Sequence, residues 1–208
     1  MSLAPVLAQI DADLDESVER LFNLLRIRSI STDPLYKEDC EEAADWLVNQ
    51  LALFGSNAKK YATSGHPMVL GDVFPKNSDG KLHILFYGHY DVQPVDPVDL
   101  WDRDPFAPAI EATPKGKVIR GRGASDDKGQ LMTFIEACRA WKLVHGDFPC
   151  RITFFFEGEE ESGSPSLVPF MQEHKEKVGG GVVLICDTGL FQSDTPAIVT
   201  RLRGLLGE

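Results

Sequence analysis

The pattern of apolar and polar positions divides the first part of the chain into two helices. Apolar residues recur every three or four positions over Ala4–Arg28, which predicts one amphipathic helix there. A second helix is expected over Tyr36–Phe54, because Asp33 and Pro34 form a helix-start signal and Gly55 a stop signal. The pattern thus predicts a pair of helices before the first strand.

Further along the chain, apolar runs alternate with helical patterns. The runs Lys81–Gly88 and Gly181–Cys186 are typical of strands that are buried on both faces. Five prolines between Gln93 and Pro114 indicate a loop over most of that segment. The other expected elements are the strands Lys59–Ala62, Met68–Phe74, Val118–Arg120 and Arg151–Glu157 and the helices Gly129–His145 and Ser164–Lys177. Strands that alternate with helices predict an α/β fold, with helices on both faces of a sheet.

Acidic and imidazole side chains follow three of the predicted strands. His89 and Asp91 follow the first buried run, Glu159–Glu161 follow the next strong strand, and Asp187 follows the last. Asp126 lies in a fourth acidic cluster, between a glycine turn and a helix. Sites in α/β folds lie beyond the carboxyl ends of the strands, and so many carboxylates there would repel one another without a cation. One histidine with several carboxylates suits zinc, manganese or cobalt better than copper or calcium.

Composition narrows the range of functions. The chain has 208 residues, 43% of them hydrophobic and 25% charged, which is ordinary for a globular domain. Its 21 Lys and Arg against 32 Asp and Glu give a net charge of −11, which argues against nucleic acid or an anionic membrane as the main partner. No apolar run approaches the length of a membrane span, and the N-terminus has no secretory signal pattern. Four scattered cysteines without a Cys-x-x-Cys pair favour reduced thiols in a cytoplasmic protein.

Simpler interpretations compete with a metal site. Glu159–Glu161 alone would be a solvated acidic turn, and Gly121–Asp126 is one glycine short of a dinucleotide fingerprint. The motifs HExxH, GxxxxGK[ST] and GxSxG are absent, which removes the commonest zincin, P-loop and serine-hydrolase interpretations. The remaining histidines are expected to be solvated or, within the buried strand, satisfied in the core: His66, His83, His145 and His174.

Taken together, the polar segments resemble the dinuclear metallopeptidases that include carnosinase-type dipeptidases, glutamate carboxypeptidase, aminoacylase and succinyl-diaminopimelate desuccinylase. The resemblance covers nearly the whole chain, and the Asp-Val-Gln-Pro form is most similar to the dipeptidase branch. The matching segments are Gly88-His-Tyr-Asp-Val-Gln-Pro94, Trp101-x-x-x-Pro-Phe106, Gly121-Arg-Gly-Ala-Ser-Asp-Asp-Lys-Gly129, Glu157-Gly-Glu-Glu-Glu-Ser-Gly-Ser164 and Cys186-Asp-Thr-Gly189. The resemblance implies the zinc-peptidase fold, a three-layer sandwich whose mixed, mostly parallel sheet has helices on both faces.

The resemblance also implies a centre of two divalent metal ions, with zinc expected first and manganese or cobalt as alternatives. His89 and Asp187 match ligands of one metal. Asp126 matches the carboxylate that bridges both metals, and Glu161 matches a ligand of the second. In the family, the peptide bond that corresponds to Asp126–Asp127 is cis.

The implied activity is hydrolysis of dipeptides or related N-acyl amino acids. Two cations can share a water, lower its pKa and polarise an amide carbonyl. Glu160 matches the general base that takes a proton from this water and passes it to the leaving amine. Asp91 matches the residue that orients His89. The alternatives are a desuccinylase, deacetylase or carboxypeptidase of the same family, or a non-catalytic metal-binding module.

The family's pattern extends beyond this chain. It needs a further metal-binding histidine in a longer chain and a lid domain that mediates dimer contacts. We therefore expect residues 1–200 to form the amino-terminal part of the catalytic domain and residues 201–208 to begin the lid. The 208-residue chain alone is expected to be inactive. The full-length enzyme is expected to be a homodimer that acts on small peptides or N-acyl amino acids, without nucleic acid or membrane partners.

Overall fold

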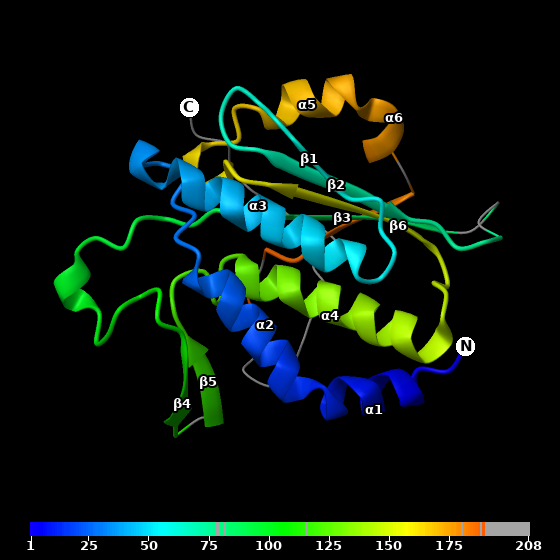
Figure 1. Ribbon diagram of the computed structural model, residues 1–208, viewed down its shortest axis with the longest axis horizontal. Helices are drawn as coiled ribbons and strands as arrows, with labels where there is room; N and C mark the ends of the chain where they lie inside the picture. Colours follow the sequence, from blue (N-terminus) through cyan, green and yellow to red (C-terminus); the bar gives the residue numbers. More distant parts are fainter. Residues whose placement is uncertain (78–79, 81, 115, 180, 188, 190–208) are drawn as a thin grey trace.

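A mixed five-stranded sheet forms the centre of the protein (Figure 1). The structure is a computed structural model that describes residues 1–77, 80, 82–114, 116–179, 181–187 and 189. The strands of the sheet are β1 (Lys59–Tyr61), β2 (Met68–Val73), β3 (His83–His89), β6 (Arg151–Glu157) and β7 (Val182–Ile185). In the order β1-β2-β6-β3-β7, β6 and β7 run parallel to β3, and the pairs β1-β2 and β2-β6 are antiparallel. The predicted mixed sheet is confirmed, although its parallel pairs do not outnumber its antiparallel ones in the described residues.

Helices cover both faces of this sheet. The described α-helices are α1 (Ala4–Ala12), α2 (Leu14–Arg26), α3 (Lys37–Ala52), α4 (Lys128–His145), α5 (Leu167–Glu173) and α6 (Lys175–Val178). Figure 1 shows α1 to α4 on one side of the sheet and α5 and α6 on the other. A hairpin of β4 (Ala109–Thr113) and β5 (Gly116–Arg120) stands apart from the main sheet. The predicted α/β sandwich of three layers is therefore confirmed.

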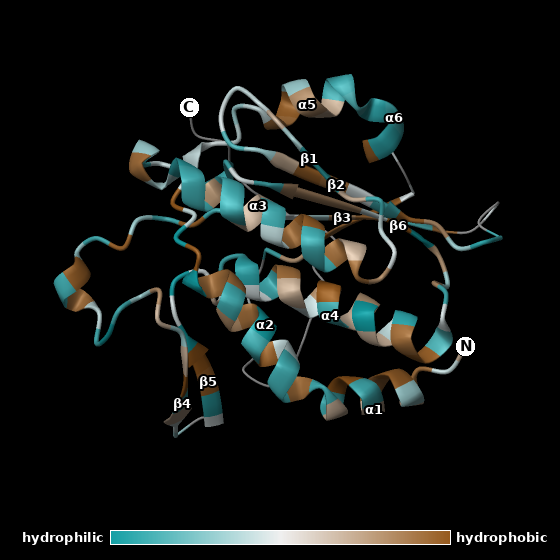
Figure 2. Cartoon of the chain, in the orientation of Figure 1, coloured by the Kyte–Doolittle hydropathy of each residue, from teal (hydrophilic) through white to brown (hydrophobic). Residues whose placement is uncertain are grey.

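The two faces of the sheet supply two hydrophobic cores, since successive side chains of a strand point to opposite faces. The larger core joins the sheet to α2, α3 and α4 and includes Leu24, Leu47, Leu131 and Phe154. The smaller core joins the other face to Phe170 of α5 and to α6. Figure 2 shows the same division, with hydrophobic strands at the centre and hydrophilic residues on the outer surfaces of the helices.

The single helix predicted over Ala4–Arg28 is wrong, because the chain bends at Asp13. There the backbone leaves the helical conformation, with φ −97° and ψ 12°, and Gln9 donates a side-chain hydrogen bond of 2.7 Å to Asp13 Oδ2. Aspartate is a weak helix former, because its side chain favours hydrogen bonds in other conformations. The bend lets both α1 and α2 pack against α4. The helix predicted over Tyr36–Phe54 is confirmed as a short 3₁₀ turn followed by α3.

Burial of the last strand was also predicted wrongly. A strand at Gly181–Cys186 is confirmed as β7, but it lies at the edge of the sheet and pairs only with β3 among the described residues. The side chains of Val182, Val183 and Ile185 are consequently 47% to 56% exposed. An apolar run predicts a strand, whereas its burial depends on which other elements cover it.

Two smaller differences concern loops and helix ends. The segment from Gln93 to Pro114 is mostly loop, as predicted, but its end forms β4 by pairing with β5. The helix predicted over Ser164–Lys177 is divided at His174 into α5 and α6. No helix in the described part of the chain is long and apolar enough to span a membrane.

A buried lysine anchors the start of α4. Lys128 is fully buried, and its Nζ donates hydrogen bonds to the backbone oxygens of Leu24, at 3.1 Å, and Ile27, at 2.6 Å. Burial lowers the pKa of this amine to about 7. The last carbonyls of a helix lack partners within it, so this amine satisfies groups at the end of α2. The contact fixes α2 to the segment that immediately follows Asp126 and Asp127.

Candidate metal centre

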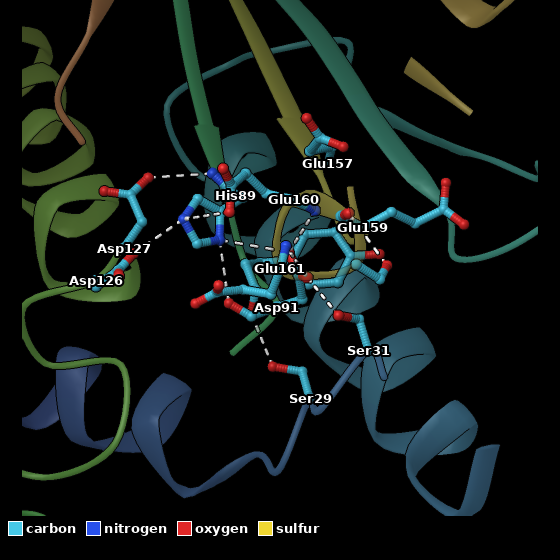
Figure 3. A network of polar contacts seen from close by, with 12 residues as sticks. Ser29, Ser31, His89, Asp91, Asp126, Asp127, Glu157, Glu159, Glu160 and Glu161 are labelled. Atoms are coloured by element: carbon cyan, nitrogen blue, oxygen red, sulfur yellow. Dashed lines mark hydrogen bonds and ion pairs between the residues drawn. The ribbon is translucent and has the colours of Figure 1, made fainter. Parts of the chain in front are cut away.

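Polar side chains from four segments meet at one edge of the sheet. Figure 3 shows His89, Asp126, Glu160 and Glu161 among them. Because β3, β6 and β7 are parallel, their carboxyl ends lie at the same edge. β3 ends at His89, and Glu160 and Glu161 lie in a 3₁₀ turn after β6. Asp187 follows β7, and Asp126 lies two residues before α4. The predicted meeting of these strand ends is confirmed.

His89 lies at the centre of the cluster and is fully buried. Its Nδ1 lies 3.1 Å from the backbone oxygen of Asp91 and 3.3 Å from Asp91 Oδ1. Its Nε2 lies 3.1 Å from Asp126 Oδ1, 3.8 Å from Asp187 Oδ2 and 3.9 Å from Glu160 Oε2. One ring nitrogen thus contacts an orienting residue and the other faces carboxylates, an arrangement typical of a metal-binding histidine.

Two sets of three side chains bring potential ligand atoms within 4.8 Å of one another. The first set is His89, Asp126 and Asp187, the same three residues that the sequence predicts at one metal. The second set is His89, Glu160 and Glu161. Among the described residues, no set of three joins Asp126 with Glu161, the pair expected at the second metal.

Asp91 connects His89 to the turn that carries the glutamates. Its side chain is fully buried, and its two oxygens accept the backbone N–H groups of Glu160, at 3.3 Å, and Glu161, at 3.0 Å. The hydroxyl of Ser31 donates a further hydrogen bond of 2.6 Å to Asp91 Oδ2. Asp91 therefore holds both the imidazole and the backbone of the acidic turn, more than the orienting role predicted for it.

The three successive glutamates occupy different environments. Glu159 is 3% exposed, and its carboxylate accepts hydrogen bonds from two backbone N–H groups outside the cluster. Glu160 and Glu161 are half-buried and belong to the cluster around His89. Glu161 Oε2 accepts a hydrogen bond of 2.7 Å from the side chain of Gln93. Of the three glutamates, the two to which the family resemblance assigns roles, Glu160 and Glu161, are therefore the ones that lie beside His89.

The peptide bond between Asp126 and Asp127 is cis, as the family resemblance implies. Asp127 is fully buried, and its Oδ2 accepts a hydrogen bond of 3.1 Å from the backbone N–H of His89. Its Oδ1 has no hydrogen-bond partner among the described residues. Burial raises the pKa of Asp127 to about 7. Asp127 therefore ties the strand end to the acidic segment before α4.

The electrostatics of the cluster fit a bound cation. Burial is the largest cause of the raised pKa values of Glu160 and Glu161, and neighbouring carboxylates raise them further. Burial alone would lower the pKa of His89, but the hydrogen bond to Asp91 and the surrounding carboxylates raise it to about 10. Among the described residues, His89 is the only basic side chain that forms ion pairs with Asp126, Glu160 and Asp187. A divalent cation would supply the missing charge, so the donor set suits a metal.

A comparison with protein families decides the assignment of the chain. The model for "Peptidase family M20/M25/M40" matches residues 85–200, which include every predicted site residue and more than half of the chain. The chain belongs to peptidase family M20/M25/M40. The predicted membership in a metallopeptidase family is thereby confirmed.

Curated relatives of this M20 chain match almost all of it. The Cys-Gly metallodipeptidase dug1 of Schizosaccharomyces pombe is 34% identical over 99% of this chain and 44% of its own length. The human Beta-Ala-His dipeptidase is 29% identical over 97% of this chain and 42% of its own length. The chain spans less than half the length of these relatives.

Solved structures agree on the M20 fold. The di-peptidase Dug1p of Saccharomyces cerevisiae superposes with a TM-score of 0.81 and 29% identity, over 91% of this chain and 42% of that one. The M20 family metallo-carboxypeptidase Sso-CP2 of Sulfolobus solfataricus gives a TM-score of 0.74 and 34% identity, over 84% of this chain and 38% of that one. The α/β fold predicted from the sequence is therefore that of known M20 peptidases.

The other histidines of this M20 chain lie outside both candidate ligand sets. His83 is half-buried, and its Nε2 contacts Thr153 Oγ1 at 2.8 Å, so it is satisfied but less buried than predicted. His66 is half-buried as well, with its Nε2 3.0 Å from the backbone oxygen of Ser31. His145 contacts the backbone oxygen of Ser2, and His174 packs against aromatic rings. None of the four is fully solvated.

Metal binding to this M20 chain is expected to release protons. The pKa of about 10 means that His89 is protonated in the metal-free protein at neutral pH, whereas a metal ligand must be neutral. The metal-free site therefore holds more protons than the metal-bound site, and affinity rises with pH. For each proton displaced, the apparent Zn²⁺ affinity should rise about tenfold per pH unit. Calorimetric titrations at about pH 7 in two buffers of different ionisation enthalpy measure the released protons; identical heats in both buffers would contradict the prediction.

Proposed function

We propose that this chain supplies the metal centre and general base of an enzyme that hydrolyses dipeptides or related N-acyl amino acids. The observation that carries the proposal is the position of His89, whose Nε2 faces the carboxylates of Asp126, Asp187 and Glu160 at the carboxyl ends of parallel strands. The dipeptidase names of the curated relatives support peptide hydrolysis.

Two divalent cations fit the residues present. His89, Asp126 and Asp187 would hold the first cation. The family resemblance assigns the second cation to Asp126 and Glu161, together with a ligand from outside the described residues. We propose zinc as the native metal, since one histidine with carboxylates is a known catalytic zinc set, with manganese and cobalt as alternatives. When bound, such cations lower the pKa of a water and polarise the scissile carbonyl.

Glu160 is proposed as the general base and then the general acid. Its side chain is 38% exposed, so it can reach a substrate, and burial raises its pKa toward the working range of a proton shuttle. Asp91 holds the backbone N–H of Glu160 and the ring of His89, and so fixes the direction of the base relative to the metal ligands. Glu160 would take a proton from the attacking water and deliver it to the leaving amine.

Residues 1–208 are proposed to be inactive alone. The family resemblance assigns the second cation only Asp126 and Glu161 in this chain, whereas the first has the set of His89, Asp126 and Asp187. The chain also spans less than half of its relatives' length. We propose that residues outside this chain supply the rest of the substrate pocket. Residues 190–208, where the lid is predicted to begin, lie outside the described residues. The cytoplasmic location and the homodimer stay predictions.

The test is a substrate panel on a complete, metal-loaded form of the protein. The panel contains unmodified dipeptides such as Cys-Gly and β-Ala-His, N-acetyl and N-succinyl amino acids, and longer peptides with a free C-terminus. Metal-dependent cleavage of dipeptides with the highest kcat/KM supports the proposal. Preference for longer peptides favours the carboxypeptidase alternative, which the likeness to Sso-CP2 keeps open. Stoichiometric metal without hydrolysis of any substrate would show a non-catalytic metal-binding module.

A further inference from the structure

We propose that Glu159 is a positioning residue, whose buried carboxylate fixes the turn that carries Glu160 and Glu161. The inference rests on the proposed function, because it concerns the two glutamates assigned there to proton transfer and metal binding. It adds a residue that binds no metal and touches no substrate.

The carboxylate of Glu159 joins two segments that are distant in sequence. Its Oε1 accepts the backbone N–H of His66, and its Oε2 accepts the backbone N–H of Ser166, both at 3.1 Å. The residue is only 3% exposed, so water competes little for these oxygens. A buried carboxylate is retained at low cost only when its oxygens are hydrogen-bonded, and here each oxygen has a donor.

Gly65 makes room for this carboxylate. A Cβ atom on Gly65 would lie 1.4 Å from Glu159 Oε1 and 2.6 Å from its carboxyl carbon. The nearest atoms to that Cβ all belong to Glu159. The loop before β2 is therefore shaped around the Glu159 side chain, and even the smallest side chain at position 65 would displace it.

The backbone of Glu159 also stabilises the turn that carries Glu160 and Glu161. Its carbonyl oxygen accepts hydrogen bonds from the backbone N–H groups of Ser162, at 3.1 Å, and Ser164, at 2.7 Å. On the other side, Asp91 accepts the N–H groups of Glu160 and Glu161. Asp91 and Glu159 thus both hold the turn that carries Glu160 and Glu161, and Figure 3 shows the four residues together.

The two anchors are also connected to each other. His66, whose N–H binds Glu159, contacts the backbone oxygen of Ser31 through its Nε2. Ser31 in turn donates its hydroxyl to Asp91 Oδ2. Loss of the Glu159 carboxylate would therefore loosen one side of a continuous network, and the side chains of Glu160 and Glu161 would lose a fixed direction.

A double-mutant cycle tests this inference: G65A, E159A and the double variant G65A/E159A. In the complete enzyme, E159A is expected to lower kcat by about 10- to 100-fold with a smaller change in KM, the usual loss when a supporting partner is removed. In the 208-residue chain, E159A should lower Co²⁺ affinity by a similar factor and alter the visible absorption of bound Co²⁺. G65A should reproduce both effects, because its Cβ expels the carboxylate. The double variant should have the same kcat and Co²⁺ affinity as E159A, because the Cβ of residue 65 then meets no carboxylate.

Two further variants keep the test decisive. E159Q retains one acceptor oxygen, so its kcat and Co²⁺ affinity should lie between those of the wild type and those of E159A. E173A removes an exposed carboxylate on α5 and should leave kcat, Co²⁺ affinity and the cobalt spectrum unchanged. Unchanged kcat and cobalt spectrum in E159A and G65A, with only a lower melting temperature, would overturn the positioning role. Absence of Co²⁺ binding by the wild-type chain would instead overturn the proposed metal centre, and the inference with it.

Discussion

Replacing Glu160 with glutamine in the complete enzyme is expected to lower kcat by about 10²- to 10⁴-fold, the usual contribution of a general base. Glutamine has nearly the same shape but cannot take a proton from water. The backbone N–H at position 160 still reaches Asp91, so the turn should keep its conformation. Steady-state kinetics with the best dipeptide of the panel measure the effect.

The same E160Q variant is expected to bind Co²⁺ almost as tightly as the wild type. His89, Asp126 and Asp187 form a complete ligand set without Glu160, and Glu161 remains available for the second cation. E173Q on α5 is the matched control, with the same chemical change at an exposed position. Normal turnover in an E160Q variant that still binds metal would remove Glu160 from the mechanism, whereas a large loss of metal affinity would make it a ligand.

Most of the candidate site followed from the order of strands and acidic residues. His89, Asp126, Glu160 and Asp187 are separated by up to 98 positions in sequence, yet three of the four segments follow apolar runs. Parallel strands have their carboxyl ends at the same edge of a sheet. If the three apolar runs form parallel strands, the polar residues that follow them therefore lie close together. That condition holds for β3, β6 and β7. The antiparallel β1 and β2, at the other side of the sheet, carry no predicted site residue.

The supporting residues could not be predicted in the same way. Ser31 and His66 are single polar residues in loops, without periodicity or spacing to mark them, and the motif that contains Gln93 does not predict its contact with Glu161. Their roles depend on loop geometry, such as the approach of Gly65 to Glu159, which no local pattern encodes. Their positions are set by tertiary contacts across 60 to 93 sequence positions between hydrogen-bonded partners.

The burial of a strand likewise depends on the elements that pack against it. Val183 and Ile185 have the apolar pattern of a buried strand but lie exposed at the sheet edge. Asp13 shows the opposite case, in which local chemistry overrides a longer pattern and divides a helix that periodicity predicts as continuous. Patterns over many residues therefore predict which elements form, and individual contacts decide where they bend and what covers them.

Replacing His89 with glutamine is expected to lower metal affinity more than any other single change. His89 belongs to both sets of candidate ligands, and its Nε2 is the only imidazole nitrogen in either set. Loss of a supporting partner of a metal ligand typically costs about 10- to 100-fold in affinity, so loss of the ligand itself should cost more than about 100-fold. Titration of the metal-free chain with Co²⁺, followed by visible absorption, measures the affinity.

A graded series separates binding by His89 from its structural effects. D91N should lose about 10- to 100-fold in Co²⁺ affinity, less than H89Q, because Asp91 acts on the metal through His89. H145Q changes a histidine at the end of α4, outside both ligand sets, and should bind Co²⁺ like the wild type. Melting temperatures of all three variants show whether the fold is kept. An H89Q variant that is folded and retains wild-type affinity would exclude His89 as a ligand, and with it the proposal that the imidazole at the end of β3 organises the centre.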